Sequence, residues 1–484
     1  MPKDLRTYLH EVAMIFPDEV RVFPNEVDPK FEITAYIEKL ETKREDPIAV
    51  FKKVKGSKLP TVANAMATYK RLSHSLDTTE KDMVEEYARR ESRPIPMKGV
   101  DKSQAPVKEV VLKGSDAKLS LLPLLYHNEL DGGKYIDSAV MQVKDPESGW
   151  INCGIYRHQI WDDGHFGIMT NPNNHANYVW RKYRDLGKPM QVALVVGHHP
   201  AYYMAAIARL PQIGGELDVA GGLMGEALDV VNAETIDMVV PARAEIVIEG
   251  VVKDPTKLVD EGPFGEWPRY YSGKKMVPVA EVTAITMRKD AIYQDIIAAH
   301  NEHTILGALP RMGSILRRVK GVVPSAIAVN LPVSGAARCH CYISMKKFVD
   351  GEPKQAAFAA FATDPNIKMV VVVDEDIDVF NEEEVLWAIA TRFQADVGLS
   401  VIPNALGGHL NPSAYALDRT KHGVMETKLI LDATIPMPPF EFAPRAMAPR
   451  AVFEKVDAGA AVRNGAEELI SMLSTKQKFV EVKR

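Results

Sequence analysis

The chain has 484 residues, of which 46% are hydrophobic and 25% are charged, and its formal net charge is -5 at pH 7. A chain of this length is expected to divide into about two or three domains. The composition is that of an ordinary soluble globular protein, and the lack of a basic excess argues against a nucleic-acid partner.

The sequence also carries no sign of a membrane or secreted protein. No stretch approaches the roughly 18 uninterrupted apolar residues that a membrane-spanning helix needs, and the first six residues lack the apolar core of a signal peptide. Cys153, Cys339 and Cys341 are too few and too unevenly placed for a disulfide framework or a Cys-rich zinc site. We therefore expect a cytoplasmic protein without a membrane partner.

The N-terminal stretch is expected to be rich in helix. From Leu5 to about Arg90 the apolar residues recur with helical spacing, as in segments 34–40 and 83–89, with Pro and Gly between the segments. This pattern predicts an α-rich N-terminal region over residues 1–110.

Short β-like runs separated by turn residues follow. The runs lie at 138–143, 191–196, 244–249 and 277–286. Their number and spacing suit a barrel, so residues 111–315 are predicted to form a β-barrel domain.

A second domain is indicated further along the chain. Segment 368–374 is a continuous apolar strand and 382–392 is an amphipathic helix, which together predict a βα unit in a domain of residues 316–445. Segment 461–473 has helical periodicity within a C-terminal tail of residues 446–484. Tails of this kind often dock on a partner subunit.

Two carboxylates lie five residues apart in the loop Glu261-Gly-Pro-Phe-Gly-Glu266. Gly262 and Gly265 give the backbone unusual freedom, and Pro263 stiffens it. Two like charges at short range push one pKa upward, which makes one carboxyl a candidate proton donor near neutral pH while the other stays anionic. The alternative for this spacing alone is an acidic surface turn.

An amide and a guanidinium, Asn152 and Arg157, follow an apolar strand pattern. Their odd spacing would place them on opposite faces of an extended strand, so a bend near Gly154 is needed if they share a site. The alternative is an exposed strand end with incidental polar residues.

His175 and Glu216 are candidate metal ligands together with Asn152. Oxygen-rich ligation with one imidazole suits Mn or Mg better than zinc. Because no close spacing of metal ligands surrounds His175, a solvated loop histidine is the alternative.

Taken together, these motifs resemble the UbiD family of decarboxylases. The similarity runs from about residue 105 to 435, and it rests on the order of the following residues: Asn152 with Arg157, His175, Glu216, Glu261 with Glu266, Lys354, the run 374–378, and Lys428. The resemblance implies a mixed α/β protein in which a split β-barrel binds prenylated FMN and adjoins a C-terminal α/β oligomerisation domain. One departure is Ile435, where the family often has a lysine.

The resemblance also implies roles for individual residues. Asn152, His175 and Glu216 would hold Mn beside the cofactor phosphate, with K nearby, and Lys354 would contact that phosphate. Arg157, Glu261 and Glu266 would form the catalytic network. No role is assigned to His300, His340 or Lys428.

The chemistry of decarboxylation explains why such a network is needed. Loss of CO2 from an aromatic carbon leaves a carbanion in the ring plane, and the side chains of a protein offer no electron sink for it, whereas a modified flavin bonded covalently to the substrate does. A carboxylic acid must then protonate the same carbon. We assign this step to Glu266, with Arg157 paired to Glu261 so that Glu261 stays anionic.

A second cluster is predicted to determine substrate specificity, and it consists of His303, Arg311 and Arg338. A guanidinium in a closed pocket needs an anion, and a second substrate carboxylate would supply it. The pair of His303 and Arg311 resembles furan-2,5-dicarboxylate decarboxylases within the family. The alternative is that Arg311 binds a protein carboxylate at a subunit contact and His303 only packs.

The expected function is therefore reversible decarboxylation of a heteroaromatic dicarboxylate, furan-2,5-dicarboxylate, to 2-furoate and CO2. The alternatives are an aromatic monocarboxylate such as pyrrole-2-carboxylate or a hydroxybenzoate, or a noncatalytic flavin-binding subunit of a carboxylase complex. A flavin prenyltransferase would supply the cofactor, and a homo-oligomer, from dimer to hexamer, is expected.

Overall fold

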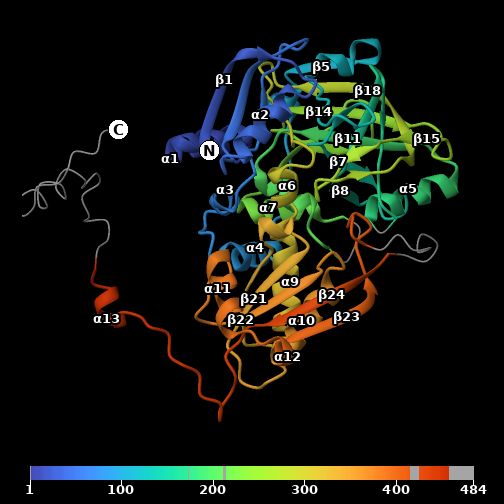
Figure 1. Ribbon diagram of the computed structural model, residues 1–484. Coiled ribbons are helices and arrows are strands. Elements are labelled where there is room, and N and C mark those ends of the chain that lie inside the picture. Colours follow the sequence, from blue (N-terminus) through green and yellow to red (C-terminus); the bar gives the residue numbers. More distant parts are fainter. Residues whose placement is uncertain (1, 173, 211–213, 415–423, 457–484) are drawn as a thin grey trace, which may run out of the picture. The chain divides into compact units, whose positions relative to one another are not determined.

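The computed structural model describes residues 2–172, 174–210, 214–414 and 424–456 (Figure 1). The chain forms two compact units, Met1–Ile435 and Pro436–Arg484. The first unit contains every element that builds the site described below.

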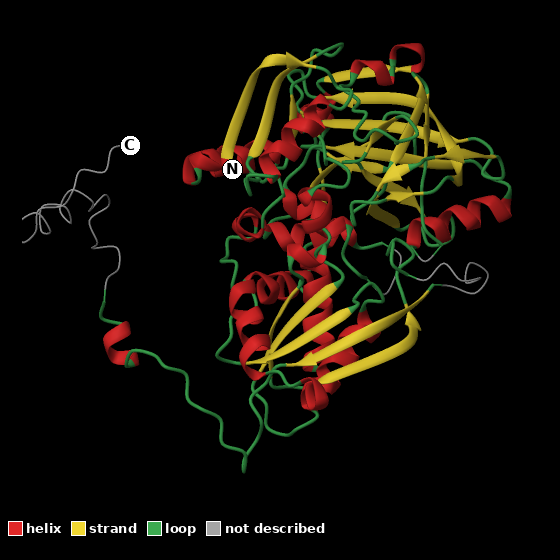
Figure 2. Ribbon diagram, in the orientation of Figure 1, coloured by secondary structure: helices red, strands yellow, loops and turns green. Residues whose placement is uncertain are grey.

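The N-terminal part of the first unit combines helices with a small sheet (Figure 2). Its helices are α1 (Leu5–Ile15), α2 (Glu32–Glu41), α3 (Tyr69–Ser75) and α4 (Met83–Glu91). Its strands are β1 (Val20–Val27), β2 (Ile48–Val54) and β3 (Thr61–Ala63), which form one sheet with β19 (Tyr293–Gln294) in the order β1-β2-β3-β19. The helices predicted at 34–40 and 83–89 are confirmed as parts of α2 and α4.

The sequence did not predict the strand β1. Most of its side chains are partly or fully exposed, and Pro24 interrupts it. A proline inside a run argues against a central strand, but β1 is an edge strand with only one neighbour. It therefore tolerates both the proline and the missing apolar face.

The middle of the chain forms the curled sheet of the split barrel. Its hydrogen-bonded path is β6-β9-β10-β18-β14-β11-β7-β8, and β5 and β15 also pair with β18. The strands are β5 (Val110–Lys113), β6 (Lys134–Ile136), β7 (Val140–Lys144), β8 (Ile151–Ile155), β9 (His158–Asp162), β10 (His165–Gly167), β11 (Met190–Val196), β14 (Ile246–Val252), β15 (Leu258–Glu261) and β18 (Lys275–Met287). The four predicted runs correspond to β7, β11, β14 and β18.

Two strands of this sheet, β11 and β14, lie in the core. In β11 and β14, nearly every residue is buried, because both faces of the sheet are covered. The helices α5 (His175–Leu186), α6 (Pro200–Ala206) and α7 (Glu216–Met224) contact β8. A small sheet of β4 (Lys98–Gly99), β12 (Asp229–Asn232) and β13 (Val239–Pro241) completes this part.

The C-terminal part of the first unit is a five-stranded sheet with helices (Figure 1). The strand order is β20-β21-β22-β24-β23, with β23 at an edge. The elements are α8 (Asn301–Ile305), α9 (Ala308–Lys320), β20 (Ala326–Asn330), β21 (His340–Met345), α10 (Glu352–Thr363), β22 (Met369–Asp374), α11 (Glu382–Arg392), α12 (Ala395–Gly398), β23 (Leu399–Leu406) and β24 (Met425–Asp432). The predicted strand at 368–374 and helix at 382–392 are confirmed as β22 and α11.

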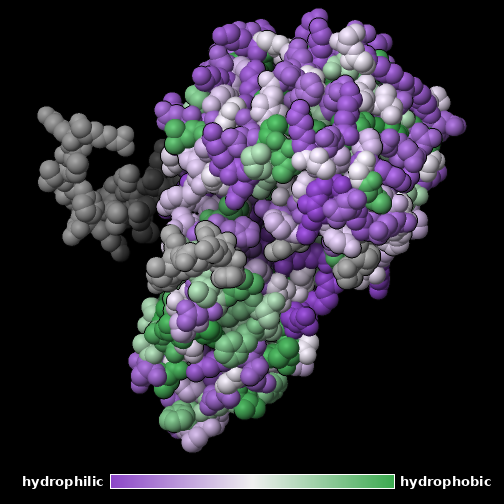
Figure 3. All heavy atoms as spheres, turned by 90° about the vertical axis from the view of Figure 1, so that its right-hand side faces the viewer, coloured by the Kyte–Doolittle hydropathy of each residue, from purple (hydrophilic) through white to green (hydrophobic). Residues whose placement is uncertain are grey.

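Apolar side chains gather on the surface of this sheet (Figure 3). Leu399, Val401 and Leu406 of β23 and Met425 of β24 are exposed. An exposed apolar edge strand is prone to pair with another chain. This is a property expected of an oligomerisation domain, and that assignment stays a prediction.

The second unit contains one short described helix, α13 (Arg450–Phe453). The helix predicted at 461–473 lies outside the described residues. Within the described part of the chain, no helix combines the length and the apolar character needed to cross a membrane.

Candidate active site

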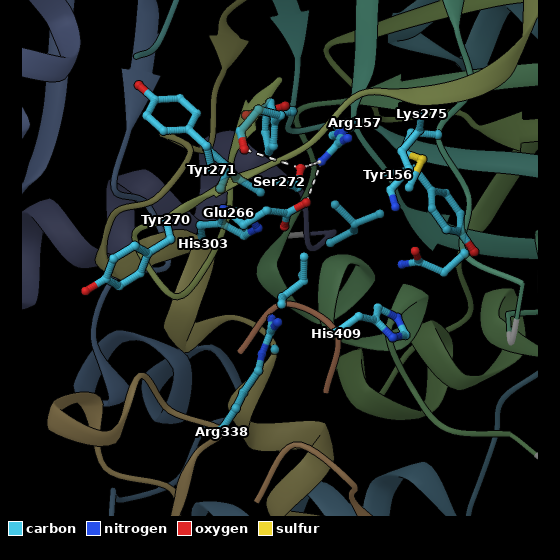
Figure 4. Close-up of a pocket in the computed structure, with 18 of the residues that line it drawn as sticks. Tyr156, Arg157, Glu266, Tyr270, Tyr271, Ser272, Lys275, His303, Arg338 and His409 are labelled. Atoms are coloured by element: carbon cyan, nitrogen blue, oxygen red, sulfur yellow. Dashed lines mark hydrogen bonds and ion pairs between the residues drawn. The ribbon is translucent and has the colours of Figure 1, made fainter. Parts of the chain in front are cut away.

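A cavity of about 380 Å³ is lined by residues of both the barrel and the C-terminal sheet region (Figure 4). The barrel contributes Tyr156 and Arg157 from the turn between β8 and β9, and Glu266 from the loop after β15. His303 of α8, Arg338 from the segment before β21, and His409 from the connection after β23 complete the wall. The sequence motifs of two distant regions thus meet at one cavity.

The loop after β15 buries one of its two carboxylates and exposes the other to the cavity. Glu261 is the last residue of β15 and is fully buried. Gly262 follows with a φ of 90°, a conformation that a side chain would strain, and the chain then turns into the short strand β16 (Phe264–Gly265). Glu266 emerges after β16 at the cavity wall. The loop is therefore not a solvated acidic turn.

Arg157 joins the two carboxylates. Its Nε donates to Glu261 Oε1 at 2.9 Å and its Nη2 donates to Glu261 Oε2 at 2.7 Å, which is a bidentate pair. Its Nη1 donates to Ser272 Oγ at 2.8 Å and also contacts Glu266 Oε1. The guanidinium lies over the ring of Phe264, 4.7 Å from its centroid. The predicted pair of Arg157 and Glu261 is present, and Glu266 shares the same cation.

The pKa of Glu266 is shifted by its surroundings. Burial raises its pKa above the usual value, although the positive charges of Arg157 and Arg338 oppose the shift. In Figure 4, Arg338 points toward Glu266 from the opposite side of the cavity. Glu266 is therefore a cavity-facing acid that holds its proton to higher pH than a solvated glutamate.

The bend expected near Gly154 lies slightly later in the chain. Gly154 is inside β8, which ends at Ile155, and β9 begins at His158. A Cβ on Gly154 would lie 2.5 Å from the Tyr156 ring, so the glycine makes room for that ring. The turn itself is formed by Tyr156 and Arg157.

Asn152 and Glu216 form a buried polar pair. Asn152 Nδ2 donates to Glu216 Oε1 at 2.6 Å, and burial raises the pKa of Glu216 to about 7. The remaining oxygens, Asn152 Oδ1 and Glu216 Oε2, are buried without a hydrogen-bond partner among the described residues. His175, half-buried, begins α5, which packs on β8 as α7 does.

A metal can be tested against this arrangement. Amide and carboxylate oxygens without a hydrogen-bond partner are the kind of donors that a hard divalent cation takes. Among the described residues, no three His, Cys, Asp or Glu side chains cluster as a metal site. The set of Asn152, His175 and Glu216 contains only two residues of these types, because its third member is an asparagine. The donors therefore fit a cation held by oxygens.

His303 and Arg338 both line the cavity. The Ala299 N–H donates to His303 Nδ1 at 3.3 Å, and burial, followed by the charge of Arg338, lowers the pKa of His303 to about 3. Arg338 lies over the Trp267 ring, 4.5 Å from its centroid, and burial lowers its pKa to about 9. Its Nε is buried without a hydrogen-bond partner in the described part of the chain.

Arg311 does not line the cavity. Its guanidinium contacts the carboxylate of Asp364, which also accepts from Arg209 at 3.0 Å. Burial alone would raise the pKa of Asp364, but the charges of Arg311 and Arg209 hold this pKa well below its usual range. The structure thus places Arg311 in an ion pair within the protein.

The remaining candidates lie away from the cavity wall. Lys354 is in the first turn of α10, and Lys428 donates to the carbonyls of Pro365 and Ile367 at 2.9 and 2.5 Å. His300 lies 3.0 Å from a carboxylate oxygen of Glu41. His340 begins β21, so it helps to form a strand.

Sequence reasoning missed several residues that surround the pair of glutamates. The Tyr135 hydroxyl donates to Glu261 Oε1 at 2.9 Å, and the Gly262 N–H donates to Gln159 Oε1 at 2.9 Å. Asp131 Oδ1 accepts from the Gly265 N–H at 2.8 Å. These partners are more than 100 residues from the loop in sequence, and no local spacing signals such contacts.

Comparison with known proteins identifies the family of the chain. Three family models match consecutive parts of the chain: the N-terminal, Rift-related and C-terminal domains of 3-octaprenyl-4-hydroxybenzoate carboxy-lyase, over residues 16–91, 98–301 and 303–433. The chain belongs to the UbiD family. It is thus a UbiD-family carboxy-lyase, and the fold predicted from the resemblance is confirmed.

Curated UbiD relatives have several named activities. The chain is 31% identical to an anhydromevalonate phosphate decarboxylase of Methanothermobacter thermautotrophicus, over 90% of this chain and 97% of the relative. It is 32% identical to a phenolic acid decarboxylase of Sedimentibacter hydroxybenzoicus, over 90% and 92%. Because similar identities accompany different substrates, the family does not by itself define the substrate.

A solved UbiD structure covers nearly the whole chain. The UbiD-class enzyme HmfF of Pelotomaculum thermopropionicum, in complex with FMN, superposes with a TM-score of 0.88 at 35% identity, covering 95% of this chain and 100% of that one. An evolved dimeric form of the same enzyme, in complex with prFMN, gives 0.83 at 34% identity.

Proposed function

We propose that this chain decarboxylates a heteroaromatic dicarboxylic acid, furan-2,5-dicarboxylate, to 2-furoate and CO2 with the help of prenylated FMN, in a reaction that is reversible in principle. The observation that carries the proposal is the network in which Arg157 binds Glu261 at both oxygens and also contacts Glu266 in the cavity wall. A buried acid beside a fixed cation suits proton delivery to a ring carbon.

Each member of the network has its own task. Arg157 keeps Glu261 in place, because an isolated buried carboxylate without that cation would be costly. Glu266 donates the proton that replaces the departing carboxylate, since its raised pKa keeps the acid form available. After donation it regains a proton from solvent through the cavity, which its side chain faces.

Prenylated FMN is the cofactor in this proposal. When bound, it supplies the electron sink that the decarboxylation requires. The cavity volume and the bound flavins of the superposed structures support a flavin in this region. A separate flavin prenyltransferase would provide the cofactor.

A divalent metal, Mn, is proposed at Asn152, His175 and Glu216, with K nearby. The unpaired oxygens of Asn152 and Glu216 support it, and a cation there would compensate the buried charge of Glu216. Lys354 stays the proposed contact of the cofactor phosphate.

The second carboxylate of the substrate is assigned mainly to Arg338. This guanidinium lines the cavity and has no carboxylate partner among the described residues, so a ligand anion would offset its desolvation. His303, neutral because of its lowered pKa, would assist with a hydrogen bond. Arg311, paired with Asp364, would add only its positive charge near this part of the cavity and no direct contact with the substrate.

One observation favours a second candidate. Because Arg311 is already paired with Asp364, only Arg338 is left to receive a second carboxylate at this wall of the cavity, in the part of the chain that the structure describes. A monocarboxylate such as pyrrole-2-carboxylate or a hydroxybenzoate would then place another ring substituent against Arg338. The named phenolic acid decarboxylase is a relative of this second kind.

The test begins with the cofactor. The full chain is expressed with and without a flavin prenyltransferase, and the bound flavin is identified by absorbance and mass. We expect prenylated FMN after co-expression and inactive protein or plain FMN without it. The oligomer, expected between dimer and hexamer, is measured on the same sample by light scattering.

The loaded protein is then given a panel of aromatic mono- and diacids. Release of CO2 from furan-2,5-dicarboxylate in preference to 2-furoate, pyrrole-2-carboxylate and hydroxybenzoates supports the dicarboxylate. A preference for a monocarboxylate overturns the choice of substrate. Loaded protein that releases no CO2 and exchanges no ring hydrogen with any acid of the panel contradicts the decarboxylase itself.

A further inference from the structure

A turn formed by residues 128–132, here called the 128–132 turn, packs against the loop that carries Glu261 and Glu266. The Gly132 N–H donates to the Pro263 carbonyl at 2.7 Å. A Cβ on Gly132 would lie 2.5 Å from the Gly262 carbonyl oxygen, and a Cβ on Gly265 would lie 2.5 Å from a side-chain nitrogen of the turn, Asn128 Nδ2. The backbones of the two segments are therefore closer than side chains would allow.

Asp131 joins the two segments through its side chain. Its Oδ1 accepts from the Gly265 N–H at 2.8 Å, and its Oδ2 accepts from the Asn128 N–H at 2.8 Å. The residue is only 3% exposed. A buried carboxylate that accepts a backbone N–H at each oxygen fixes both backbones, and Gly265 directly precedes Glu266.

The 128–132 turn is itself held from two sides. The Tyr126 hydroxyl donates to the Asp131 carbonyl at 2.6 Å. The Leu130 N–H donates to the hydroxyl of Tyr271 at 3.0 Å, and Tyr271 lines the cavity. The 128–132 turn thus links the loop that carries Glu261 and Glu266 to Tyr271, a second part of the cavity wall.

We propose that Asp131 is a positioning residue that holds Glu266 beside Arg157. Asp131 does not line the cavity, so it acts through the Gly265 backbone. Glycines at 262 and 265 leave the loop conformationally free, and the carboxylate supplies the order that they do not. The inference rests on the proposed function only in assigning proton donation to Glu266.

The main test is Asp131→Asn in the flavin-loaded protein. Asparagine offers one accepting oxygen, so one of the two N–H donors must face its NH2 group. We expect kcat to fall about 10- to 100-fold with KM within about twofold, because a displaced acid slows the chemical step more than binding. We also expect the fall of kcat on the alkaline side of its pH profile to move to higher pH. The reason is that Arg157 lowers the pKa of Glu266 only while the two side chains are close.

A matched control separates positioning from general destabilisation. Asp145 is also buried, accepts from the Ser148 N–H and pairs with Lys182, but it does not line the cavity. Asp145→Asn is expected to leave the pH profile in place. The positioning role is overturned if both variants lose kcat equally or if the pH limb of Asp131→Asn does not move.

Hydrogen exchange tests the inference without any turnover. Peptides covering residues 258–273 should exchange faster in Asp131→Asn and at the wild-type rate in Asp145→Asn. If the wild-type enzyme decarboxylates no acid, the proposed function fails, while this measurement still tests whether Asp131 orders the loop that carries Glu266. Should Asp131→Asn not fold, Tyr126→Phe removes one bond to the turn and is expected to show the same local increase; unchanged exchange there contradicts the proposal.

Discussion

The two sides of the cavity hold their arginines in opposite ways. Arg157, on the barrel side, donates hydrogen bonds to Glu261, Glu266 and Ser272. Arg338, on the C-terminal side, stacks on Trp267 and has no hydrogen-bonded or ion-paired partner among the described residues. The protein itself supplies the anions for Arg157, whereas no described carboxylate pairs with Arg338. Under the proposed function, the catalytic network around Arg157 is already formed without substrate, whereas Arg338 acquires its anion only when the substrate binds.

The largest effect is expected from Glu266→Gln. The amide cannot donate a proton to the ring carbon, so kcat should fall about 10²- to 10⁴-fold while flavin binding persists. Product release is followed by chromatography, and bound flavin by absorbance. Glu281→Gln, an exposed carboxylate paired with Lys253, serves as the control and should stay within about twofold of wild type. A Glu266→Gln enzyme with near-normal kcat would remove this residue from the mechanism.

The next effect compares the stability of the two sides. Arg157→Met leaves Glu261 buried without its cation and should lower the free energy of unfolding by about 3–5 kcal/mol. Arg338→Met removes a partly buried guanidinium that lacks a protein anion among the described residues, so it should be neutral or stabilising. Thermal unfolding of both variants in parallel measures the difference. Equal losses of unfolding free energy in the two variants would mean that Arg338 has a protein partner of similar strength. The two arginines would then not differ in how the protein holds them.

A smaller effect separates Arg338 from Arg311. Arg338→Ala should lower kcat/KM for furan-2,5-dicarboxylate about 10- to 100-fold, because a bidentate charged contact is lost, and it should change turnover of a monocarboxylate far less. Arg311→Ala should mainly reduce stability, since its guanidinium pairs with Asp364. Kinetics with matched mono- and diacids decide this. If Arg311→Ala is the variant that loses the diacid selectively, the grip belongs to Arg311 as the sequence resemblance suggested.

Much of the fold follows from local patterns. The helix predicted at 382–392 coincides with α11, and the run at 191–196 lies within β11, because both have unbroken periodicity. The strand β1 was missed because its exposed face and Pro24 remove the alternation that marks a strand. Edge strands are stabilised by a neighbour that no local window contains.

The site divides in the same way. The spacing of Glu261 and Glu266 predicted a raised pKa for one of the two carboxyls, and the pKa of Glu266 is raised, but burial is its main cause and the charge of Glu261 is the smallest of the named causes. The pairing of Arg311 with Asp364, 53 residues later, has no periodic signature, so the sequence predicts it no better than a role for Arg311 in the substrate pocket. Asp131 was not singled out, since a buried acid bonded to a backbone 134 residues away leaves no trace in spacing.

The smallest predicted effect links the two sides electrostatically. The charge of Arg338 lowers the pKa of Glu266, so Arg338→Met should raise that pKa further. The acid form donates the proton, so kcat should fall as pH rises through this pKa, and the fall should move to higher pH by up to about 1 unit in the variant.

The measurement is the pH profile of kcat for a monocarboxylate that does not need the Arg338 contact. Arg338→Lys keeps a positive charge and should leave the profile close to wild type, which separates charge from shape. A downward shift in Arg338→Met would mean that a group other than Glu266 limits the alkaline side. Arg157 and Arg338 both oppose the effect of burial on the pKa of Glu266. An unmoved profile would therefore mean that Arg157 is the only one of the two cations that matters for this pKa, and the two sides of the cavity would then be electrostatically independent.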